Sequence, residues 1–272
     1  MGLEIEIVSR SKGSNHGGCC LIKEENIDVP MSYYIKHCSG SRIRKGESSL
    51  NPFHQPIYEA ITCEMAQRLG LNTSNFYVLL NLKKNLIFIS KGELKSNIKS
   101  KQPFYFASEL LIPSKDEDFG KVKKIIEEET FYRDILMISD IVGRKQNYFY
   151  DSFSENIFYI DLGCNFVDAH ENFIELKHHH KPPLAKKELK NALKFLKKYS
   201  IKTNCKKGPI SLIDFVNLPR EMSILTMNPR KNVRLDKLIS EDEIEEIIGR
   251  IISGLYFGKQ LKRKNNPYLI RN

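Results

Sequence analysis

Met31-Ser32-Tyr33-Tyr34-Ile35-Lys36 combines aromatic and β-branched residues, which favour strands, and it ends in a lysine. Before it, residues 3–8 alternate polar and apolar side chains. Residues 9–18 then hold three glycines, and an apolar run covers residues 19–23. This pattern predicts a hairpin with a glycine-rich tip, followed by a third strand that ends at Lys36.

One helix and three more strands are expected next. From Pro56 to Leu69 apolar residues recur every four positions, which predicts an amphipathic helix that carries Glu59 and ends at Gly70. Aromatic and β-branched runs predict strands over residues 76–82, 86–90 and 104–111. The first part of the chain is therefore predicted to be rich in β-structure.

The second part is predicted to be mainly helical, with one hairpin. Apolar spacing indicates helices over residues 121–138 and 184–199. Ser240 and Glu243 have the spacing of a capping box and predict the start of a last helix. Between these helices, two short aromatic strands flank a turn over residues 151–156.

The composition limits the class of protein. The chain has 272 residues and a formal charge of +10, with a mean hydropathy of −0.39. Its six cysteines form no zinc-type spacing, and the amino terminus lacks the features of a secretory signal. No apolar run approaches the roughly 20 residues of a membrane span. We expect a cytoplasmic protein, or one secreted by a non-Sec route into a host cytosol.

The order of these elements resembles the protein-kinase superfamily. The similarity rests on the glycine turn, the lysine on the third strand, the glutamate on the next helix, and Ile160-Asp161-Leu162-Gly163, which is similar to the D-F-G turn with Leu in place of Phe. Asn147 precedes Asp161 by 14 residues across the predicted hairpin. The resemblance implies a bilobal α+β fold, with a β-rich N-lobe over residues 1–112 and a helical C-lobe over residues 113–272.

The resemblance also implies roles for single residues. Lys36 would contact the phosphates of ATP, and Glu59 would hold Lys36 in place. Asn147 and Asp161 would bind Mg²⁺ or Mn²⁺. Residues 106–111 would form the hinge between the lobes. The nucleotide would also contact the glycine-rich turn, an apolar side chain beside adenine, and the hinge. The contacts would be Gly13, Ser14, Gly17 and Gly18 in the turn, Ile22 beside adenine, and Glu109 and Leu111 in the hinge.

The catalytic loop departs from the family pattern. In H-R-D-x-x-x-x-N the aspartate stands five residues before the asparagine, but position 142 is valine. Asp140 would serve as the base if the loop holds two extra residues, and Arg144 would steady the transferred phosphoryl group; a purely structural Asp140 is the alternative. The loop looks closest to HipA-like toxin kinases and phosphoinositide-kinase-like proteins, and a bacterial effector kinase is the nearest suggestion.

A lysine- and histidine-rich segment over residues 177–207 has three interpretations. The first is the solvated face of a helix whose leucines are buried. The second is a site for a polyanion such as an inositol polyphosphate or a phosphoinositide headgroup. Nucleic acid is third, because the segment holds no arginine and few aromatic residues. The candidate polyanion contacts are Lys177, His178, His180, Lys186, Lys187 and Lys190.

Taken together, the sequence predicts an atypical kinase that depends on ATP and a divalent metal. Its acceptor is predicted to be a protein, and the chain itself is a second candidate acceptor. A polyanion is predicted to regulate the transfer. Two alternatives stay open. One is a pseudokinase that only binds, which the missing H-R-D favours. The other is a phosphoinositide or small-molecule kinase, for which the basic segment would be the substrate site.

Overall fold

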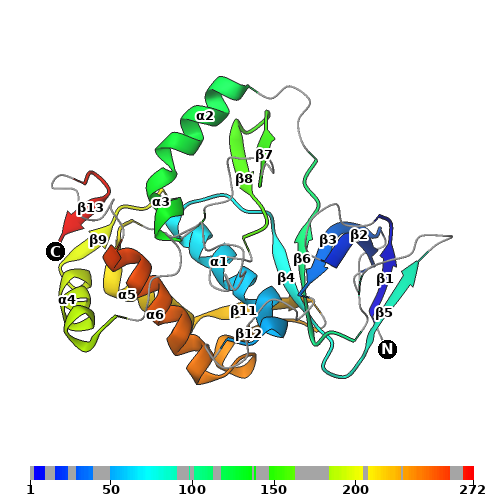
Figure 1. The fold of residues 1–272 in the computed structure, drawn as a ribbon. Helices are drawn as coiled ribbons and strands as arrows, with labels where there is room; N and C mark the ends of the chain where they lie inside the picture. The colour runs from blue at the N-terminus through cyan, green and yellow to red at the C-terminus, as the bar shows by residue number, and fades with distance from the viewer. Residues whose placement is uncertain are drawn as a thin grey trace.

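The computed structural model describes residues 3–9, 16–23, 29–38, 50–90, 98, 101–112, 118–136, 138, 147–162, 184–204, 208–227, 229–257 and 266–272. These residues form a mixed α/β structure with a curled β-sheet at one side and helices at the other (Figure 1). The mixed character expected from the sequence is confirmed. The division into two kinase-like lobes at residues 112 and 113 stays a prediction.

The largest sheet has eight strands in the order β12-β11-β4-β6-β3-β2-β1-β5. Most neighbours are antiparallel, while β1 with β5 and β4 with β11 are parallel. Two strands from the last third of the chain, β11 and β12, thus extend a sheet built by its first part. The strands are β1 (Leu3–Ile7), β2 (His16–Ile22), β3 (Met31–His37), β4 (Phe76–Leu80), β5 (Leu86–Ser90), β6 (Phe104–Glu109), β11 (Ser223–Met227) and β12 (Arg230–Arg234).

The other elements lie around this sheet. A hairpin pairs β7 (Tyr148–Asp151) with β8 (Asn156–Tyr159), and a small sheet has the order β10-β9-β13. Its strands are β9 (Tyr199–Ile201), β10 (Ile210–Ser211) and β13 (Leu269–Arg271). The helices are α1 (Gln55–Leu69), α2 (Phe119–Glu128), α3 (Thr130–Ile135), α4 (Lys186–Leu196), α5 (Leu212–Glu221) and α6 (Glu241–Phe257).

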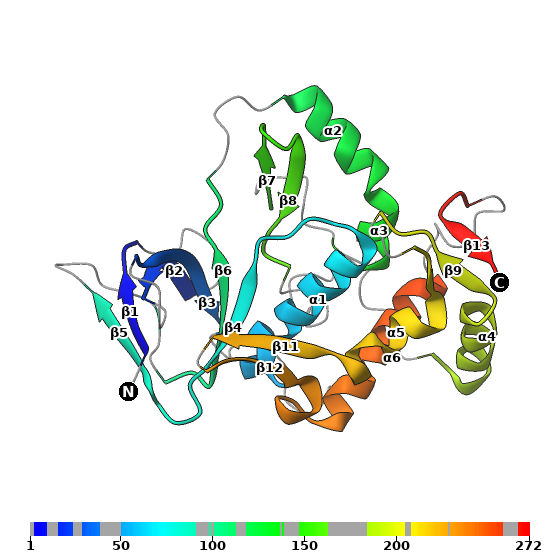
Figure 2. The same ribbon diagram turned by 180° about the vertical axis from the view of Figure 1, so that it is seen from behind.

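Helix α1 is the centre of the structure. It lies between the sheet and the helices α3, α5 and α6, as the view from behind also shows (Figure 2). One core cluster surrounds it and includes Ile57, Ile61 and Met65, which have no exposed surface. A second, smaller cluster fills the opposite face of the sheet, around Tyr105 and Ile35. The sheet is therefore buried on both faces near its middle.

Several predicted elements agree with the structure. The helix expected over residues 56–69 is α1, and Gly70 ends it in the left-handed conformation with φ of +86°. The capping box at α6 is present, since the Ser240 N–H donates to Glu243 Oε2 at 3.0 Å and the Glu243 N–H donates to Ser240 Oγ at 3.3 Å. Both features depend only on neighbours in the chain.

Two predicted elements differ. The helix expected over residues 121–138 is divided into α2 and α3, because Glu129 leaves helical geometry at their junction. There its carboxylate accepts a hydrogen bond from the Tyr159 hydroxyl at 2.6 Å. Gly17 and Gly18, expected in the turn, lie inside β2 opposite Lys36 and Ile35. A Cβ built on Gly17 would stand 2.3 Å from the Ile35 carbonyl oxygen, so close approach of β2 and β3 explains this glycine.

Among the described residues, no helix has the length and apolar character needed to cross a membrane.

Gly17→Ala should weaken the contact between β2 and β3. The added methyl group meets backbone and not a flexible side chain, so we expect the free energy of unfolding to fall by about 2 kcal/mol, measured by urea denaturation. Gly249→Ala is the control, because this glycine lies in α6 and a Cβ added there would meet no neighbouring atom within 4 Å. That variant should gain about 0.5–1 kcal/mol. A Gly17→Ala protein as stable as the parent would contradict the close approach.

Candidate functional site

A buried lysine lies between two carboxylates at the centre of the candidate site. Lys36 Nζ is 2.5 Å from Glu59 Oε1 and 2.7 Å from Asp161 Oδ1. The Lys36 side chain is 8% exposed, the Glu59 side chain 2%, and the Asp161 side chain 40%. The ammonium group is therefore enclosed by protein, while Asp161 connects it to the solvent side.

Each of the three residues comes from a different segment. Lys36 is near the end of β3, where its side chain points to the sheet face that α1 covers. Glu59 lies in the second turn of α1, and this helix packs mainly on β6 and β4. Asp161 follows β8 and lies 125 residues after Lys36. Tertiary packing, and not local sequence, therefore creates the cluster.

The hairpin that carries Asp161 is fixed to the segment after α1. The Tyr159 N–H donates to the Asn72 carbonyl at 2.9 Å, and Thr73 pairs with Tyr159 as an isolated bridge. Two residues later, Asp161 has φ of +55°, a conformation that aspartate tolerates better than most residues. The chain thus turns sharply at the position where its carboxylate meets Lys36.

Burial and charge oppose one another in this cluster. Burial raises the pKa of Glu59 to about 7, against the opposing attraction of Lys36 and a hydrogen bond from the Leu162 N–H. Burial also disfavours the charged form of Lys36, but Asp161 and Glu59 together outweigh it and raise the pKa of Lys36 above its ordinary value. Lys36 is therefore a fixed positive charge, and Glu59 is the group in the cluster that is sensitive to pH.

The structure places Asn147 close to Asp161 along the backbone. The Ile160 N–H donates to the Asn147 carbonyl at 3.0 Å, which extends the β7–β8 pairing to the residue before Asp161. Both residues therefore lie at the open end of one hairpin. Within the described part of the chain, no group of three or more His, Cys, Asp and Glu side chains is arranged to hold a metal ion.

Other predicted nucleotide contacts are spread over the sheet. Gly17 lies directly opposite Lys36 in β2. Ile22 is fully buried in the second core cluster, on the sheet face opposite to Lys36. Strand alternation gives this placement, since Gly17 and Ile22 are an odd number of residues apart. A nucleotide next to Lys36 would not touch Ile22.

The predicted hinge lies at the end of β6. The Glu109 N–H donates to the Asn75 carbonyl at 2.9 Å, and its side chain accepts a hydrogen bond from Asn75 Nδ2 at 2.9 Å. The Leu110 N–H donates to the Ser32 carbonyl at 3.0 Å. Leu111, half-buried, follows this strand end. The N–H groups of residues 109 and 110 thus bind neighbouring backbone, while Glu109 and Leu111 remain predicted contacts.

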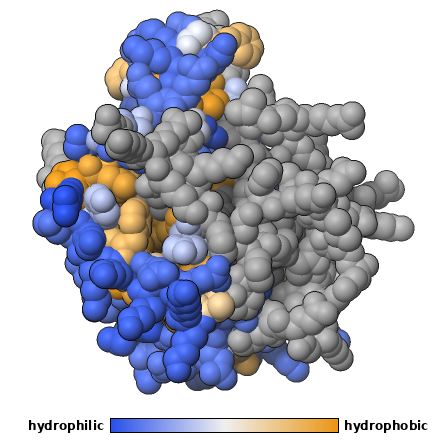
Figure 3. All heavy atoms as spheres, turned by 60° about the vertical axis from the view of Figure 1, so that its left-hand side comes forward, coloured by the Kyte–Doolittle hydropathy of each residue, from blue (hydrophilic) through white to orange (hydrophobic). Residues whose placement is uncertain are grey.

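Seven predicted site residues lie outside the described residues: Gly13, Ser14, Asp140, Arg144, Lys177, His178 and His180. The other three polyanion candidates, Lys186, Lys187 and Lys190, lie exposed in the first half of α4. The same helix places Ala192 and Leu196 in the core and Leu193 partly against it, but Leu189, which was expected on the buried side, is exposed. Figure 3 brings the left-hand side of Figure 1 forward, and the coloured residues there form a mainly hydrophilic surface with several apolar patches. The structure is compatible with a solvated helix face and with a polyanion site.

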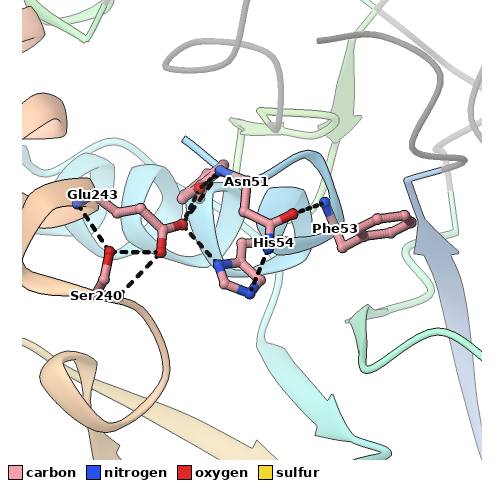
Figure 4. A network of polar contacts seen from close by, with 6 residues as sticks. Asn51, Phe53, His54, Ser240 and Glu243 are labelled. Atoms are coloured by element: carbon pink, nitrogen blue, oxygen red, sulfur yellow. Dashed lines mark hydrogen bonds and ion pairs between the residues drawn. The ribbon is translucent and has the colours of Figure 1, made fainter. Parts of the chain in front are cut away.

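Sequence reasoning missed a polar network that fixes the start of α1 to the start of α6. Glu243 Oε1 accepts hydrogen bonds from His54 Nδ1 at 2.7 Å and from the Tyr58 hydroxyl at 2.5 Å (Figure 4). The Asn51 N–H donates to the same hydroxyl at 2.8 Å. Because Tyr58 is adjacent to Glu59, the network positions the helix that carries the glutamate of the candidate site. Only the capping role of Glu243 had a sequence signal.

Comparisons of the chain with protein-family models, with curated proteins and with solved structures found no match.

Glu59 should make stability depend on pH. Its pKa in the folded state, about 7, lies above the ordinary 4.5, so the folded state favours the protonated acid. The contribution of protonated Glu59 to the free energy of unfolding is complete below about pH 4.5 and is lost as the pH rises through about 7. Between about pH 5 and about pH 8, urea denaturation should show the parent losing roughly 2 kcal/mol more than Glu59→Gln.

Lys36→Met provides a second variant for the same experiment. It removes the cation that opposes burial, so the pKa of Glu59 should rise further and the loss of stability should move to higher pH. Parallel pH profiles for the parent and Glu59→Gln would show that Glu59 does not titrate in this range.

Glu243 should act in the acid range, with the opposite sign. Burial favours its neutral form, but hydrogen bonds from His54, Tyr58 and the Ser240 N–H outweigh burial and lower its pKa to about 2. Its contribution to stability is complete above about pH 4.5 and is lost as the pH falls towards about 2. Glu243→Gln should therefore lower the free energy of unfolding by about 2 kcal/mol at neutral pH. Its free energy of unfolding should also fall less than that of the parent as the pH is lowered.

Glu245→Gln is the control on the same helix. Glu245 pairs with Arg220 at the surface, so its removal should change the free energy of unfolding by less than about 0.5 kcal/mol at neutral pH. Equal costs for the two variants in urea denaturation would contradict the anchoring role of Glu243.

Proposed function

We propose that this chain binds ATP together with a divalent cation and transfers the γ-phosphoryl group to a protein. The observation that carries the proposal is the position of Lys36 Nζ between Glu59 Oε1, at 2.5 Å, and Asp161 Oδ1, at 2.7 Å. A strand lysine, a helix glutamate and an aspartate after a later hairpin are the three charges that phosphoryl transfer of the protein-kinase type uses beside the phosphates.

The cost of this arrangement supports a functional role. Burying an ion pair is seldom favourable for stability, because both groups lose hydration. Here one buried cation faces two acidic groups, so the cluster carries an excess of negative charge when Glu59 is ionised. A bound cation beside Asp161 would offset this excess. In a purely structural role, apolar residues of similar volume are often as stable as a buried ion pair, or more stable.

The residues near Asp161 fit a hard divalent cation. Carboxylate and amide oxygens are ligands that Mg²⁺ and Mn²⁺ accept, and such ions are commonly held by one or two protein groups plus phosphates and water. Asp161, which is 40% exposed, and Asn147 would hold the ion. When bound, the ion supplies neutralisation of phosphate charge.

The chain's own residues would then bind and orient the phosphates. Lys36, fixed by Glu59, presents a permanent positive charge at the sheet face. Helix α1 keeps Glu59 in register with Lys36 because its first turn is tied to α6 through Glu243. Asp140 as the base and Arg144 as a phosphoryl contact remain part of the proposal, from the sequence alone.

The acceptor is proposed to be a protein, with this chain itself as one candidate. The exposed lysines of α4 would bind a polyanion such as an inositol polyphosphate, which regulates transfer. If the chain were instead a phosphoinositide or small-molecule kinase, the same lysines would bind the substrate. A binding module without transfer is the second candidate function, and the absence of H-R-D from residues 139–147 favours it.

Transfer of ³²P from γ-labelled ATP tests the proposal. The parent chain, with Mg²⁺ or Mn²⁺, should label a general protein substrate or itself, and Asp161→Ala should reduce labelling at least about 100-fold. Asp151→Ala is the matched control in the same hairpin. Its carboxylate accepts hydrogen bonds from Ser154 and the Phe153 N–H in the exposed turn, and its loss should change labelling less than about twofold.

Two further arms separate the alternatives. ATP bound without transfer under any condition would replace the kinase proposal by the binding module. The triple variant Lys186→Ala, Lys187→Ala, Lys190→Ala should abolish stimulation by an inositol polyphosphate in a regulated protein kinase. In a lipid or inositol phosphate kinase it should raise the KM for that substrate and leave ATP binding unchanged.

A further inference from the structure

Strands β4 and β11 meet near one end and separate toward the other. They are parallel, and among the described residues their register holds one pair of partners, Thr226 and Val78. The view from behind shows the two strands meeting near the end of β11 and diverging toward their starts (Figure 2). A cavity of about 770 Å³ lies along this divergence, lined by residues of both strands that precede the pair. We call this cavity, whose lining includes residues 75–77 and 223–225, the β4–β11 notch.

The notch is closed at one end and open at the other. The pair of Thr226 and Val78 closes it, while Asn75 and Ser223 line the end where the strands begin. Helix α1 contacts both strands and contributes Gln67 to the lining. A chain that enters in the plane of the sheet therefore meets the joined strands after about three residues. The shape of the notch favours the end of a polypeptide over a segment from its middle.

Backbone hydrogen-bonding groups border the notch. The Glu109 N–H donates to the Asn75 carbonyl in the pairing of β4 with β6. Hydrogen-bonded residues alternate along an antiparallel strand, so the N–H and carbonyl of the next residue, Phe76, point to the side of β11. The same alternation in the pairing of β11 with β12 points the backbone groups of Ser223 to the side of β4. An extended peptide that adds to a sheet binds such groups.

A guanidinium group lies across the closed end of the notch. Arg230 is in β12, opposite Met227, and β11 separates β12 from β4. Its Nη2 donates to the hydroxyl of Tyr77 in β4 at 3.2 Å, and its Cζ lies 5.4 Å from the centroid of that ring. The side chain of Arg230 therefore crosses β11 and brings its charge to the residue next to Val78. Guanidinium groups bind carboxylates through two parallel hydrogen bonds.

The other charges of the lining give the notch a direction. Arg68 is paired with Glu64 at 3.4 Å, so these two charges largely offset one another. Glu221 precedes the first residue of β11 by two positions and lines the open end. A positive closed end and a negative open end favour a chain whose carboxyl terminus points inward. Phe76 and Leu218 add apolar surface for a side chain of that terminus.

We propose that the β4–β11 notch binds the carboxyl-terminal end of another polypeptide in extended form. The terminal carboxylate is held by Arg230, and the main chain runs parallel to β4 and is hydrogen-bonded to the strand edge at Phe76. The lining does not include Lys36 or Asp161. This inference is therefore independent of the proposed phosphoryl transfer, and the failure of one leaves the other in place.

Two pools of random pentapeptides test the inference on the unaltered chain. One pool has free carboxyl ends and the other has amidated ends, and each is passed over the immobilised full chain. The retained peptides are measured by mass spectrometry. The pool with free carboxyl ends should be retained at least about fivefold more, because only a carboxylate accepts two charge-assisted hydrogen bonds from Arg230.

Substitutions then locate the binding. The most strongly retained acid peptide is labelled with fluorescein at its amino end and titrated by fluorescence polarisation. Arg230→Leu should raise its Kd by about tenfold and remove the difference between the acid and its amide. Lys231→Leu is the matched control, because it removes the same charge from the neighbouring residue, whose side chain lies on the other face of β12. It should change the Kd less than about twofold.

A substitution at the open end tests the notch itself. Ser223 is exposed at the start of β11, so Ser223→Trp should obstruct the entrance and weaken binding of the acid and of the amide alike. Equal retention of the two pools, or retention of neither, would overturn the inference. Tight binding that Ser223→Trp and Arg230→Leu leave unchanged would place the peptide elsewhere on the molecule and would overturn it as well.

Discussion

The ammonium group of Lys36 is the point on which the arrangement of the molecule depends. It sits where a strand, a helix and a hairpin meet, and each supplies one charged group. If the lysine were lost, two acidic groups would face one another with little solvent to separate them, which proteins avoid. Removal of one of these charges would disturb the balance, so the three segments depend on one another for it.

Helix α1 holds Glu59 in place within this cluster. Its first turn is joined to α6 by Glu243, and the segment after its last turn is joined to β8 through Asn72 and Thr73. Its buried side chains fill the main core. Glu59 therefore sits on a helix that is restrained at both ends, by α6 and by the β7–β8 hairpin.

Local signals in the sequence predicted local features. The spacing of Ile57, Ile61 and Met65 and the glycine at position 70 predicted α1, and Ser240 with Glu243 predicted the start of α6. The sequence also proposed Lys36, Glu59 and Asp161 as members of one site, and the structure places the three in contact. Their role at a nucleotide is still a prediction.

Other features that depend on contacts between distant residues were not predicted. The face of Ile22 depends on the register between β2 and β3, and a shift of one residue reverses it. The glycines at 17 and 18 have the composition of a turn, yet the close approach of two strands places them in β2. The contact of His54 with Glu243 spans 189 residues, and no spacing rule connects them.

The sheet is completed late in the chain. Strand β11, with β12 beside it, reaches β4 through the pairing of Thr226 with Val78, although all the other strands of this sheet lie before residue 110. During synthesis, more than a hundred further residues must therefore be added after β4 before β11, its neighbour in the sheet, exists. Such non-local pairing slows folding and leaves a strand edge open to other chains in the interval. The nascent protein is thus expected to depend on chaperones until its last third has left the ribosome.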